Sequence, residues 1–240
     1  MNRLAIIPAR GGSKRIHKKN IKNFCGKPII SYSLEAAKCS NLFNTIHVST
    51  DCNGIASVVT ELGYSIDFFR DPSLADDMTP IMPVLKWVVS EYESRSIFFD
   101  EVVLIMPCSP MIESFDLQQA SILMDKTNRT KPVIAISSYP VPTEWAFTRN
   151  NLNGSLIPAY PGKFKIRSQD LEKKYFDAGS FIFFPKNHII SSRLDGDDES
   201  FVGYIIDKVK AIDIDDQDDW DHAELIMELI QNKKSREQES

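Results

Sequence analysis

The chain has few residues of the kinds that form disulfide frameworks or zinc centres, with four cysteines and four histidines among its 240 residues. The cysteines stand at irregular intervals and no two form a C-x-x-C pair, which favours four reduced thiols in a cytosolic protein. The histidines are equally scattered, which argues against a zinc site. These residues are Cys25, Cys39, Cys52, Cys108, His17, His47, His188 and His222.

A long hydrophobic run is also lacking at the start of the chain, where the first apolar run, residues 4–9, is six residues long. A run of this length is too short for the core of a signal peptide or for a membrane span. We therefore expect a cytoplasmic protein that has no membrane partner.

Charge is unevenly distributed along the chain. The 28 basic and 33 acidic residues give a net charge of −5, and a net acidic chain is a poor general binder of nucleic acid. The first 34 residues, however, contain eight Lys or Arg and no acidic residue. A basic segment on an otherwise acidic protein indicates a local site for an anion.

Apolar segments of strand length alternate with amphipathic segments of helix length. This pattern predicts an α/β protein with a three-layer, Rossmann-like fold and a mostly parallel sheet, organised as one domain over residues 1–240. Ligands of such folds bind beyond the carboxyl ends of the strands. We expect strands near residues 4–9, 45–50, 65–69, 101–106, 132–137, 180–184, 202–206 and 209–214, and helices near 29–39, 53–62, 79–94, 115–125 and 218–230, followed by a solvated tail after 232.

The alternation is interrupted between about residues 138 and 177, where Pro, Tyr, Asn and charged residues show no helical period. A segment of this length without regular structure is typical of an active-site cover or of an arm that contacts another subunit. We expect residues 140–175 to form such an irregular element within the single domain.

A basic loop follows the first predicted strand and reads Ala9-Arg-Gly-Gly-Ser-Lys-Arg-Ile-His-Lys-Lys-Asn20. Gly11 and Gly12 allow backbone amides to approach a ligand closely, and Ser13 adds a hydroxyl group. Arginine and lysine side chains bind phosphate oxygens, and this loop supplies Arg10, Lys14, Arg15 and Lys19. The pattern matches neither the P-loop nor the dinucleotide fingerprint, but it predicts a site for a triphosphate.

An acidic segment near the other end of the chain contains Asp213 and Asp215, two residues apart in a strand-like run. Side chains at this spacing share one face of a strand, and two neighbouring carboxylates repel each other unless a cation lies between them. Carboxylate oxygens suit Mg²⁺, which commonly binds one or two carboxylates together with substrate phosphates. The alternative is that the aspartates cap the last helix, which is the interpretation we favour for Asp218, Asp219 and Asp221.

The motif Ile7-Pro-Ala-Arg-Gly-Gly-Ser-Lys14 resembles the CTP-binding signature of cytidylyltransferases that activate sialic-acid-like sugars. The resemblance extends to about residue 230 through Val48-Ser-Thr-Asp51, Phe69-Arg-Asp-Pro-Ser-Leu-Ala-Asp-Asp77 and Asp213-Ile-Asp215. Arg167-Ser-Gln-Asp-Leu171 and Tyr175-Phe-Asp-Ala-Gly179 are similar to the pseudaminic acid branch of that family.

The resemblance implies a nucleotide-diphospho-sugar transferase type of fold with a protruding dimerisation arm. It implies that a nonulosonic acid attacks CTP, with Mg²⁺ as cofactor, to give a CMP-sugar and pyrophosphate for surface glycans or flagellin. It implies catalytic roles for Arg10, Lys14, Lys19, Asp213 and Asp215, metal binding by Asp213 and Asp215, and CTP binding by Ala9, Arg10, Gly11, Gly12, Ser13, Lys14, Lys19, Asn20, Arg70, Ala75, Asp76 and Asp77. Relatives are commonly homodimers, so we expect a homodimer.

The sugar brings its own carboxylate, so its pocket needs a second cation. Arg167 is our candidate, although it could instead pair with Asp170 or Glu172. We expect Gln169, Asp170 and Asp177 to bond sugar hydroxyl or acylamino groups and Tyr139 to form an apolar wall. Met106 stands where sialic-acid synthetases usually have Gln, and Ala178 where they have Asn, which favours a more apolar sugar such as pseudaminic acid.

Three alternatives to this function remain. Synthetases for legionaminic acid or N-acetylneuraminic acid share the basic loop and the acidic pair and differ only in the sugar pocket. An aspartyl phosphatase requires lysine and acidic motifs on later strands, and 25 residues follow Asp215. A non-catalytic nucleotide-binding regulator has no need of paired carboxylates opposite the basic loop.

Overall fold

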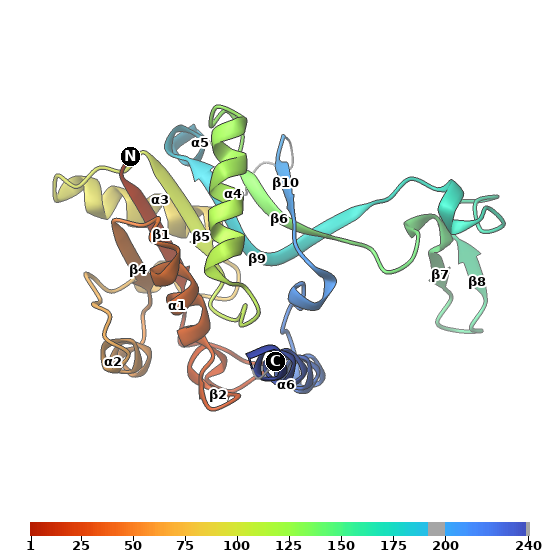
Figure 1. The fold of residues 1–240 in the computed structure, drawn as a ribbon, viewed down its shortest axis with the longest axis horizontal. Coiled ribbons are helices and arrows are strands. Elements are labelled where there is room, and N and C mark those ends of the chain that lie inside the picture. Colours follow the sequence, from red (N-terminus) through yellow and green to blue (C-terminus); the bar gives the residue numbers. More distant parts are fainter. Residues whose placement is uncertain (192–199, 239–240) are drawn as a thin grey trace.

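The computed structural model describes the backbone of residues 1–191 and 200–238 (Figure 1). The strands are β1 (Arg3–Pro8), β2 (Asn23–Phe24), β3 (Lys27–Pro28), β4 (Thr45–Ser49), β5 (Glu101–Ile105), β6 (Val133–Ser138), β7 (Phe147–Arg149), β8 (Leu156–Pro158), β9 (Tyr175–Pro185) and β10 (Val202–Ile205). The helices are α1 (Ile30–Ser40), α2 (Asn53–Glu61), α3 (Ile81–Ser94), α4 (Ser114–Lys126), α5 (Lys186–Ser191) and α6 (Gln217–Gln238).

A six-stranded sheet forms the centre of the described chain, with the strand order β10-β6-β9-β5-β1-β4. β1 is parallel to β4 and β5, and β10 is parallel to β6. β9 runs antiparallel to both β5 and β6, and its pairing with β6 shifts register between Ile134 and Ile136. The predicted α/β fold with a mostly parallel sheet is therefore confirmed.

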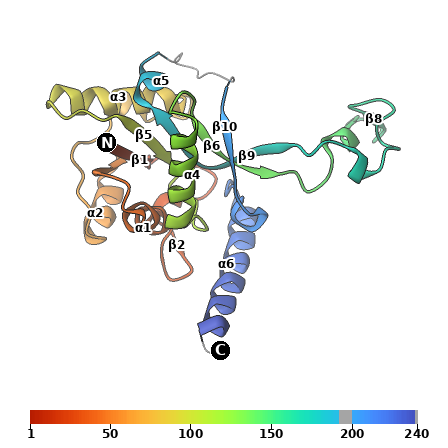
Figure 2. The same ribbon diagram turned by 45° about the horizontal axis from the view of Figure 1, so that its top comes forward.

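The two faces of the sheet are covered by different helices, which makes three layers (Figures 1 and 2). Successive side chains of β1 point to opposite faces, as the period of a strand requires. Ala5 and Ile7 pack with side chains of α1, α2 and α4, whereas Leu4 and Ile6 pack with side chains of α3 and α5. Because both faces are buried, β1 is apolar at nearly every position.

An arm of residues 139–174 leaves the body between β6 and β9 (Figure 2). Its outer part is the antiparallel β7–β8 hairpin, and the Trp145 and Phe147 rings contact Phe164 at its base. Large apolar side chains remain exposed on it, among them Leu152 at 98%, Ile157 at 61% and Phe164 at 61%. The expected irregular segment is thus an arm that carries a short hairpin and does not cover the sheet.

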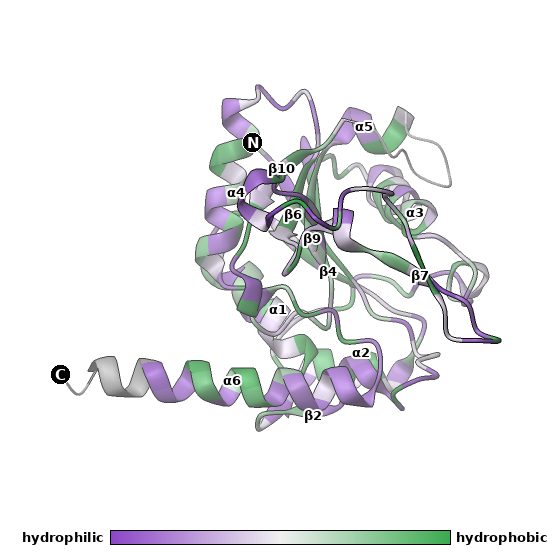
Figure 3. Cartoon of the chain, turned by 90° about the vertical axis from the view of Figure 1, so that its right-hand side faces the viewer, coloured by the Kyte–Doolittle hydropathy of each residue, from purple (hydrophilic) through white to green (hydrophobic). Residues whose placement is uncertain are grey.

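The last helix, α6, also extends away from the body (Figure 3). Its first turns dock through Trp220, which is 1% exposed and meets the Phe24 ring edge-on at 5.3 Å. Ile16, Met111 and Ile214 belong to the same apolar cluster. The expectation of a tail after residue 232 was wrong, because the helix continues to Gln238. No helix in the described residues is long and apolar enough to cross a membrane.

Two expected strands are absent from the described chain. Residues 65–69 run beside β4 without forming a strand, and the backbone hydrogen bond that follows them, from Arg70 N–H to Thr50 O, lies beyond the end of β4. The turn Lys208–Lys210 is 3₁₀ and residues 211–214 are irregular, and the Lys210 ammonium forms ion pairs with Asp116 and Glu113 at the start of α4. The premise that Asp213 and Asp215 share a strand face was therefore wrong.

Substituting Trp220 tests the docking of α6. We expect Trp220→Ala to lower the free energy of unfolding by about 3–5 kcal/mol, because it removes a fully buried ring from the cluster beneath the helix. Leu225→Ala on the same helix, where the leucine is 62% exposed, should change it by less than about 0.5 kcal/mol. Urea denaturation measures both values, and equal effects would show that the helix does not dock through Trp220.

Candidate active site

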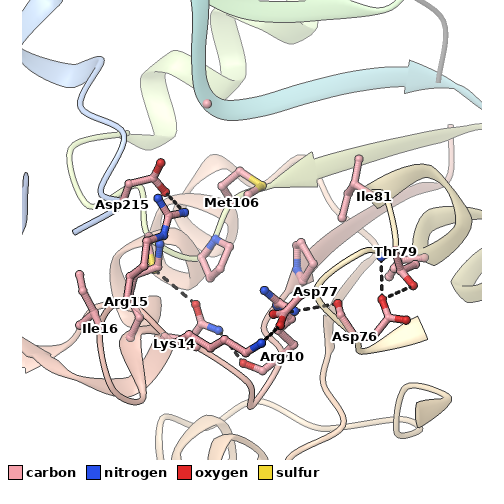
Figure 4. A pocket seen from close by; sticks show the side chains of 18 of the residues that line it. Arg10, Lys14, Arg15, Ile16, Asp76, Asp77, Thr79, Ile81, Met106 and Asp215 are labelled. Carbon is pink, nitrogen blue, oxygen red and sulfur yellow. Dashed lines mark hydrogen bonds and ion pairs between the residues drawn. The ribbon is translucent and has the colours of Figure 1, made fainter. Parts of the chain in front are cut away.

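A pocket of about 290 Å³ lies beyond the carboxyl ends of β1 and β5 (Figure 4). It brings together the basic loop near the start of the chain and the acidic pair near its end. The candidate residues that line it are Arg10, Ser13, Lys14, Lys19, Asn20, Arg70, Asp76, Asp77, Asp213 and Asp215. Ala9, Gly11, Gly12 and Ala75 are adjacent in sequence but do not line it.

The basic loop is held by contacts with the loop after β4. The backbone N–H of Gly11 donates to the Asp51 carboxylate over 2.9 Å, so this amide is already engaged. A Cβ atom at Gly11 would lie 2.9 Å from Cβ of Cys52, which leaves no space for a side chain there. The Asn20 amide donates to the Arg10 carbonyl over 3.0 Å and closes the loop from its other end. The contact with Cys52 requires glycine at position 11, and its role in CTP binding stays a prediction.

The cations of the loop meet carboxylates from two other parts of the chain (Figure 4). Arg10 pairs with Asp77 at 2.6 Å and donates to the Asp76 carbonyl at 2.7 Å, and Lys14 pairs with Asp77 as well. Hydrogen bonds from Lys14 and Arg10 hold the pKa of the Asp77 carboxyl below its ordinary value. Arg10 and Lys14 therefore act together on one anionic group, as binding of a phosphate also requires.

Lys19 and Arg15 connect the basic loop to the acidic segment. The Lys19 ammonium donates to the Ile214 carbonyl over 2.6 Å, and Arg15 pairs with Asp215 at 2.7 Å. The buried Ile214 side chain fixes the segment, so its two neighbours, Asp213 and Asp215, both face the pocket although neither lies in a strand.

Asp213 lies against Gly179 of β9, where the register of the sheet is irregular. Gly179 has φ +63°, and a Cβ atom there would lie 3.5 Å from Cγ of Asp213. The pKa of the Asp213 carboxyl is raised, first because protein atoms displace part of its water and second because Asp215 repels its charge. A cation between the two carboxylates would relieve this repulsion.

The chemistry of the acidic pair fits a magnesium ion. In the described part of the chain no three His, Cys, Asp or Glu side chains gather into a metal cluster. Two carboxylates beside a basic loop nevertheless suit Mg²⁺, which prefers oxygen ligands and commonly binds one or two carboxylates. Soft ligands do not compete, because Cys108 is the nearby thiol and its burial raises its pKa to about 12.

Arg70 forms the opposite end of the pocket, toward β4. Its guanidinium donates to the Ser49 hydroxyl at 3.0 Å and to the Ser49 carbonyl at 2.7 Å. The residue is 5% exposed, and burial lowers its pKa to about 10. Arg70 is therefore a fixed part of the wall, in contrast to the exposed Lys14 and Arg15 of the basic loop.

The candidate sugar-binding residues do not join this pocket within one chain. Arg167 lies on the arm and pairs with Asp170 at 2.9 Å, which is the alternative we had named for it. Tyr139 and Gln169 line a separate cavity of about 420 Å³ at the base of the arm. Asp177 comes nearest, because its carboxylate accepts the Gly179 N–H over 2.9 Å and acts on Asp213 through its charge.

Several pocket residues were absent from the predicted site. Leu74, Thr79, Ile81 and Val84 line the side formed by the start of α3, and Pro107 and Cys108 follow β5. Met106, which the sequence had marked as a departure from relatives, points into the pocket (Figure 4). The loop after β5 was expected to bear ligand contacts, whereas nothing in the sequence connected α3 with the site.

Comparison with known proteins agrees with this geometry. The family model described as cytidylyltransferase matches residues 4–195. The chain is 37% identical over 183 residues to a pseudaminic acid cytidylyltransferase from Campylobacter jejuni subsp. jejuni serotype O:2, covering 76% of this chain and 78% of the relative. It is 30% identical over 237 residues to the CMP-N,N'-diacetyllegionaminic acid synthase of Legionella pneumophila, covering 96% and 98%.

A solved structure shares the fold. The chain superposes with a TM-score of 0.68 on a CMP:2-keto-3-deoxy-manno-octonic acid synthetase complexed with CTP. The match covers 95% of this chain and 99% of that one at 14% sequence identity. At this identity the likeness concerns the arrangement of the sheet and its helices.

Proposed function

The chain belongs to the cytidylyltransferase family, and on this premise we propose that it is a CTP-dependent enzyme that activates pseudaminic acid. The products are CMP-pseudaminic acid and pyrophosphate. The observation that carries the proposal is the meeting of the basic loop with Asp213 and Asp215 around one pocket. A cradle for phosphates opposite a carboxylate pair is what transfer of a nucleotidyl group requires.

The roles of the residues follow from their places around the pocket. Arg10, Ser13, Lys14 and Lys19 bind the triphosphate, and Asn20 keeps the loop in shape. Arg70 with Asp76 and Asp77 forms the side toward β4, where the nucleoside lies. The anomeric hydroxyl of the sugar attacks the α-phosphorus and loses its proton to solvent. The bond from that phosphorus to the oxygen that bridges it to the β-phosphorus breaks, and pyrophosphate leaves with the electron pair.

Asp213 and Asp215 would hold Mg²⁺, which when bound supplies neutralisation of charge on the triphosphate. Arg15 keeps the Asp215 carboxylate in place through its ion pair. Gly179 leaves the space in which Asp213 turns toward the pocket. These contacts of the chain itself position the carboxylates for the cation.

Legionaminic acid and N-acetylneuraminic acid are the alternative sugars, and the likeness to the Legionella synthase makes the first a direct rival. Met106 favours a deoxygenated sugar, because an apolar side chain lines the pocket where sialic-acid synthetases usually have Gln. A hydroxyl group placed against such a surface loses its hydrogen bonds with water, which costs about 1–3 kcal/mol. A non-catalytic nucleotide-binding regulator would not need the carboxylate pair.

The identity of the sugar can be tested directly. The protein, CTP and Mg²⁺ are incubated with pseudaminic, legionaminic and N-acetylneuraminic acids, and pyrophosphate release is measured. We expect the largest kcat/KM with pseudaminic acid, by about 10-fold or more, which corresponds to about 1.4 kcal/mol. A preference for legionaminic acid would assign the other sugar, and no release with any of them would refute the enzyme.

Substitution of Asp213 tests the carboxylate pair. We expect Asp213→Asn to reduce turnover about 100-fold or more at low Mg²⁺, because it removes one of two charged ligands. The matched control is Asp218→Asn, an exposed residue in the first turn of α6. A titration of rate against Mg²⁺ concentration should shift for the first variant and not for the second. An unchanged curve for Asp213→Asn would remove it from the metal site.

We also propose that the protein is a cytoplasmic homodimer joined through its arms. Four free thiols favour a reducing compartment. The arm exposes large apolar side chains that the described part of its own chain does not cover, which favours their burial against a second subunit. In a dimer, Arg167, Gln169 and Tyr139 of an arm would be free to approach the sugar pocket of the other subunit.

A charge on the arm should break such a dimer. We expect Leu156→Asp to convert the protein from dimer to monomer in light scattering, since this β8 side chain is 57% exposed in one chain. Leu225→Asp, at an equally exposed leucine of α6, should leave the dimer intact. Dissociation by the α6 variant alone would place the interface on that helix instead.

A further inference from the structure

The chain between β4 and the pocket is positioned by side chains, not by a sheet ladder. Residues 65–69 run beside β4, and the hydrogen bond from Arg70 N–H to Thr50 O, 2.7 Å long, joins backbone to backbone at the end of this run. Arg70 follows immediately and contributes to the pocket wall. The place of Arg70 therefore depends on its own hydrogen bonds to Ser49 and Thr50 and on the contacts that fix the preceding residues.

The side chain of Tyr92 on α3 holds these residues by bonding both to β4 and to the segment itself. Its hydroxyl lies 2.5 Å from Oδ2 of Asp67 and 3.1 Å from Nδ1 of His47, which stands on β4. Tyr92 is 2% exposed and His47 is 1% exposed, so the hydrogen bond between them is shielded from water, whereas Asp67 lies at the surface and its hydrogen bond is half-buried. One hydroxyl group thus joins the helix, the edge strand and the extended segment.

The neighbouring Phe68 is enclosed by aromatic rings. It stacks on His47 at 4.4 Å and meets Tyr92 at 5.0 Å and Trp87 at 5.5 Å, measured between ring centroids. The Arg95 guanidinium covers the ring at 4.2 Å. The contacts of Asp67 and Phe68 together determine the position of residues 65–69 along β4, and hence the position of Arg70, which follows them.

The directions of the hydrogen bonds follow from the groups. A carboxylate only accepts, so Tyr92 gives its one proton to Asp67 and accepts from Nδ1–H of His47. His47 is neutral, because burial lowers its pKa to about 4. Removing the hydroxyl leaves the buried Nδ1–H of His47 without a partner, which is costly, and it releases the exposed Asp67 from α3.

We propose that Tyr92 is a positioning residue for nucleotide binding, which acts through Asp67 and Phe68 on Arg70. The proposal rests on the proposed function. Arg70 lies toward the β4 edge, whereas the phosphate-binding cations lie on the loop after β1 and the carboxylate pair lies beyond β5 and β9. A nucleotide whose phosphates lie between the cations and the carboxylates extends its nucleoside toward Arg70. Tyr92 consequently affects the nucleoside end of the site and not the triphosphate end.

The test compares Tyr92→Phe, which keeps the ring, with Tyr204→Phe. The Tyr204 hydroxyl also donates to a carboxylate, Oδ1 of Asp116 at 3.4 Å, but it lies on β10 at the opposite edge of the sheet. We expect Tyr92→Phe to raise the KM for CTP by 5-fold or more and to change kcat by less than 2-fold. Tyr204→Phe should change neither value. CMP-sugar formation is followed by anion-exchange chromatography, and CTP affinity by calorimetry without sugar.

Inhibition by pyrophosphate separates the two ends of the site. Pyrophosphate has no nucleoside, so its inhibition constant should change less than 2-fold in Tyr92→Phe. Asp67→Asn retains an oxygen that accepts from Tyr92 and should keep the CTP affinity of the wild type, whereas Asp67→Ala should match Tyr92→Phe. These asparagine and alanine variants decide the question even where Tyr92→Phe folds poorly.

Each other outcome overturns the proposal. An unchanged CTP affinity in Tyr92→Phe and Asp67→Ala would show that the network does not position the site. Equal losses for CTP and pyrophosphate, or equal losses in Tyr204→Phe, would indicate general destabilisation. If the wild type binds CTP but converts no sugar, the proposed function fails, and the calorimetric comparison still decides the role of Tyr92.

Discussion

The hydrogen bond from the Lys19 ammonium to the Ile214 carbonyl joins segments 195 positions apart, and the geometry of the pocket depends on it. It brings a cluster of positive charge against a pair of negative charges, an arrangement that is stable because each side compensates the other. The apolar cluster around Trp220 also joins the same two segments, because it contains Ile16 of the basic loop and Ile214 of the acidic segment. Apolar packing thus fixes the distance between the two segments, and their charges determine what the pocket can bind.

The central sheet could be predicted from the sequence because its middle strands β1 and β5 are buried on both faces and therefore largely apolar. The prediction failed where side chains decide the backbone. Residues 65–69 alternate in burial as a strand does, yet Phe68 and Asp67 are held by α3, and the ladder with β4 does not form. Lys210 likewise ends the strand-like run that includes Asp213, through ion pairs with carboxylates 94 and 97 positions away.

The part of the site that consists of charged residues was predictable from the sequence. The loop after β1 and the Asp213–Asp215 pair carry recognisable charge, and both line the pocket. The apolar side was not predictable, because Ile81 and Val84 have the helical spacing of ordinary core residues. The arm residues Arg167 and Gln169 show a different limit, since a local motif says nothing about which pocket, or which subunit, its side chains reach.

β9 has a consequence for how this protein can vary. The strand begins at Tyr175, at the root of the arm, and reaches Gly179, beside the acidic pair, over about 13 Å of extended chain. The irregular pairing lies in this stretch, because β9 passes five residues, from Asp177 to Ile182, where β6 advances two, from Ile134 to Ile136. The extra residues of β9 include Gly179, which lies beside Asp213. A change in the length of the hairpin at the tip leaves this stretch unaltered, whereas a deletion within it would move the backbone beside the acidic pair.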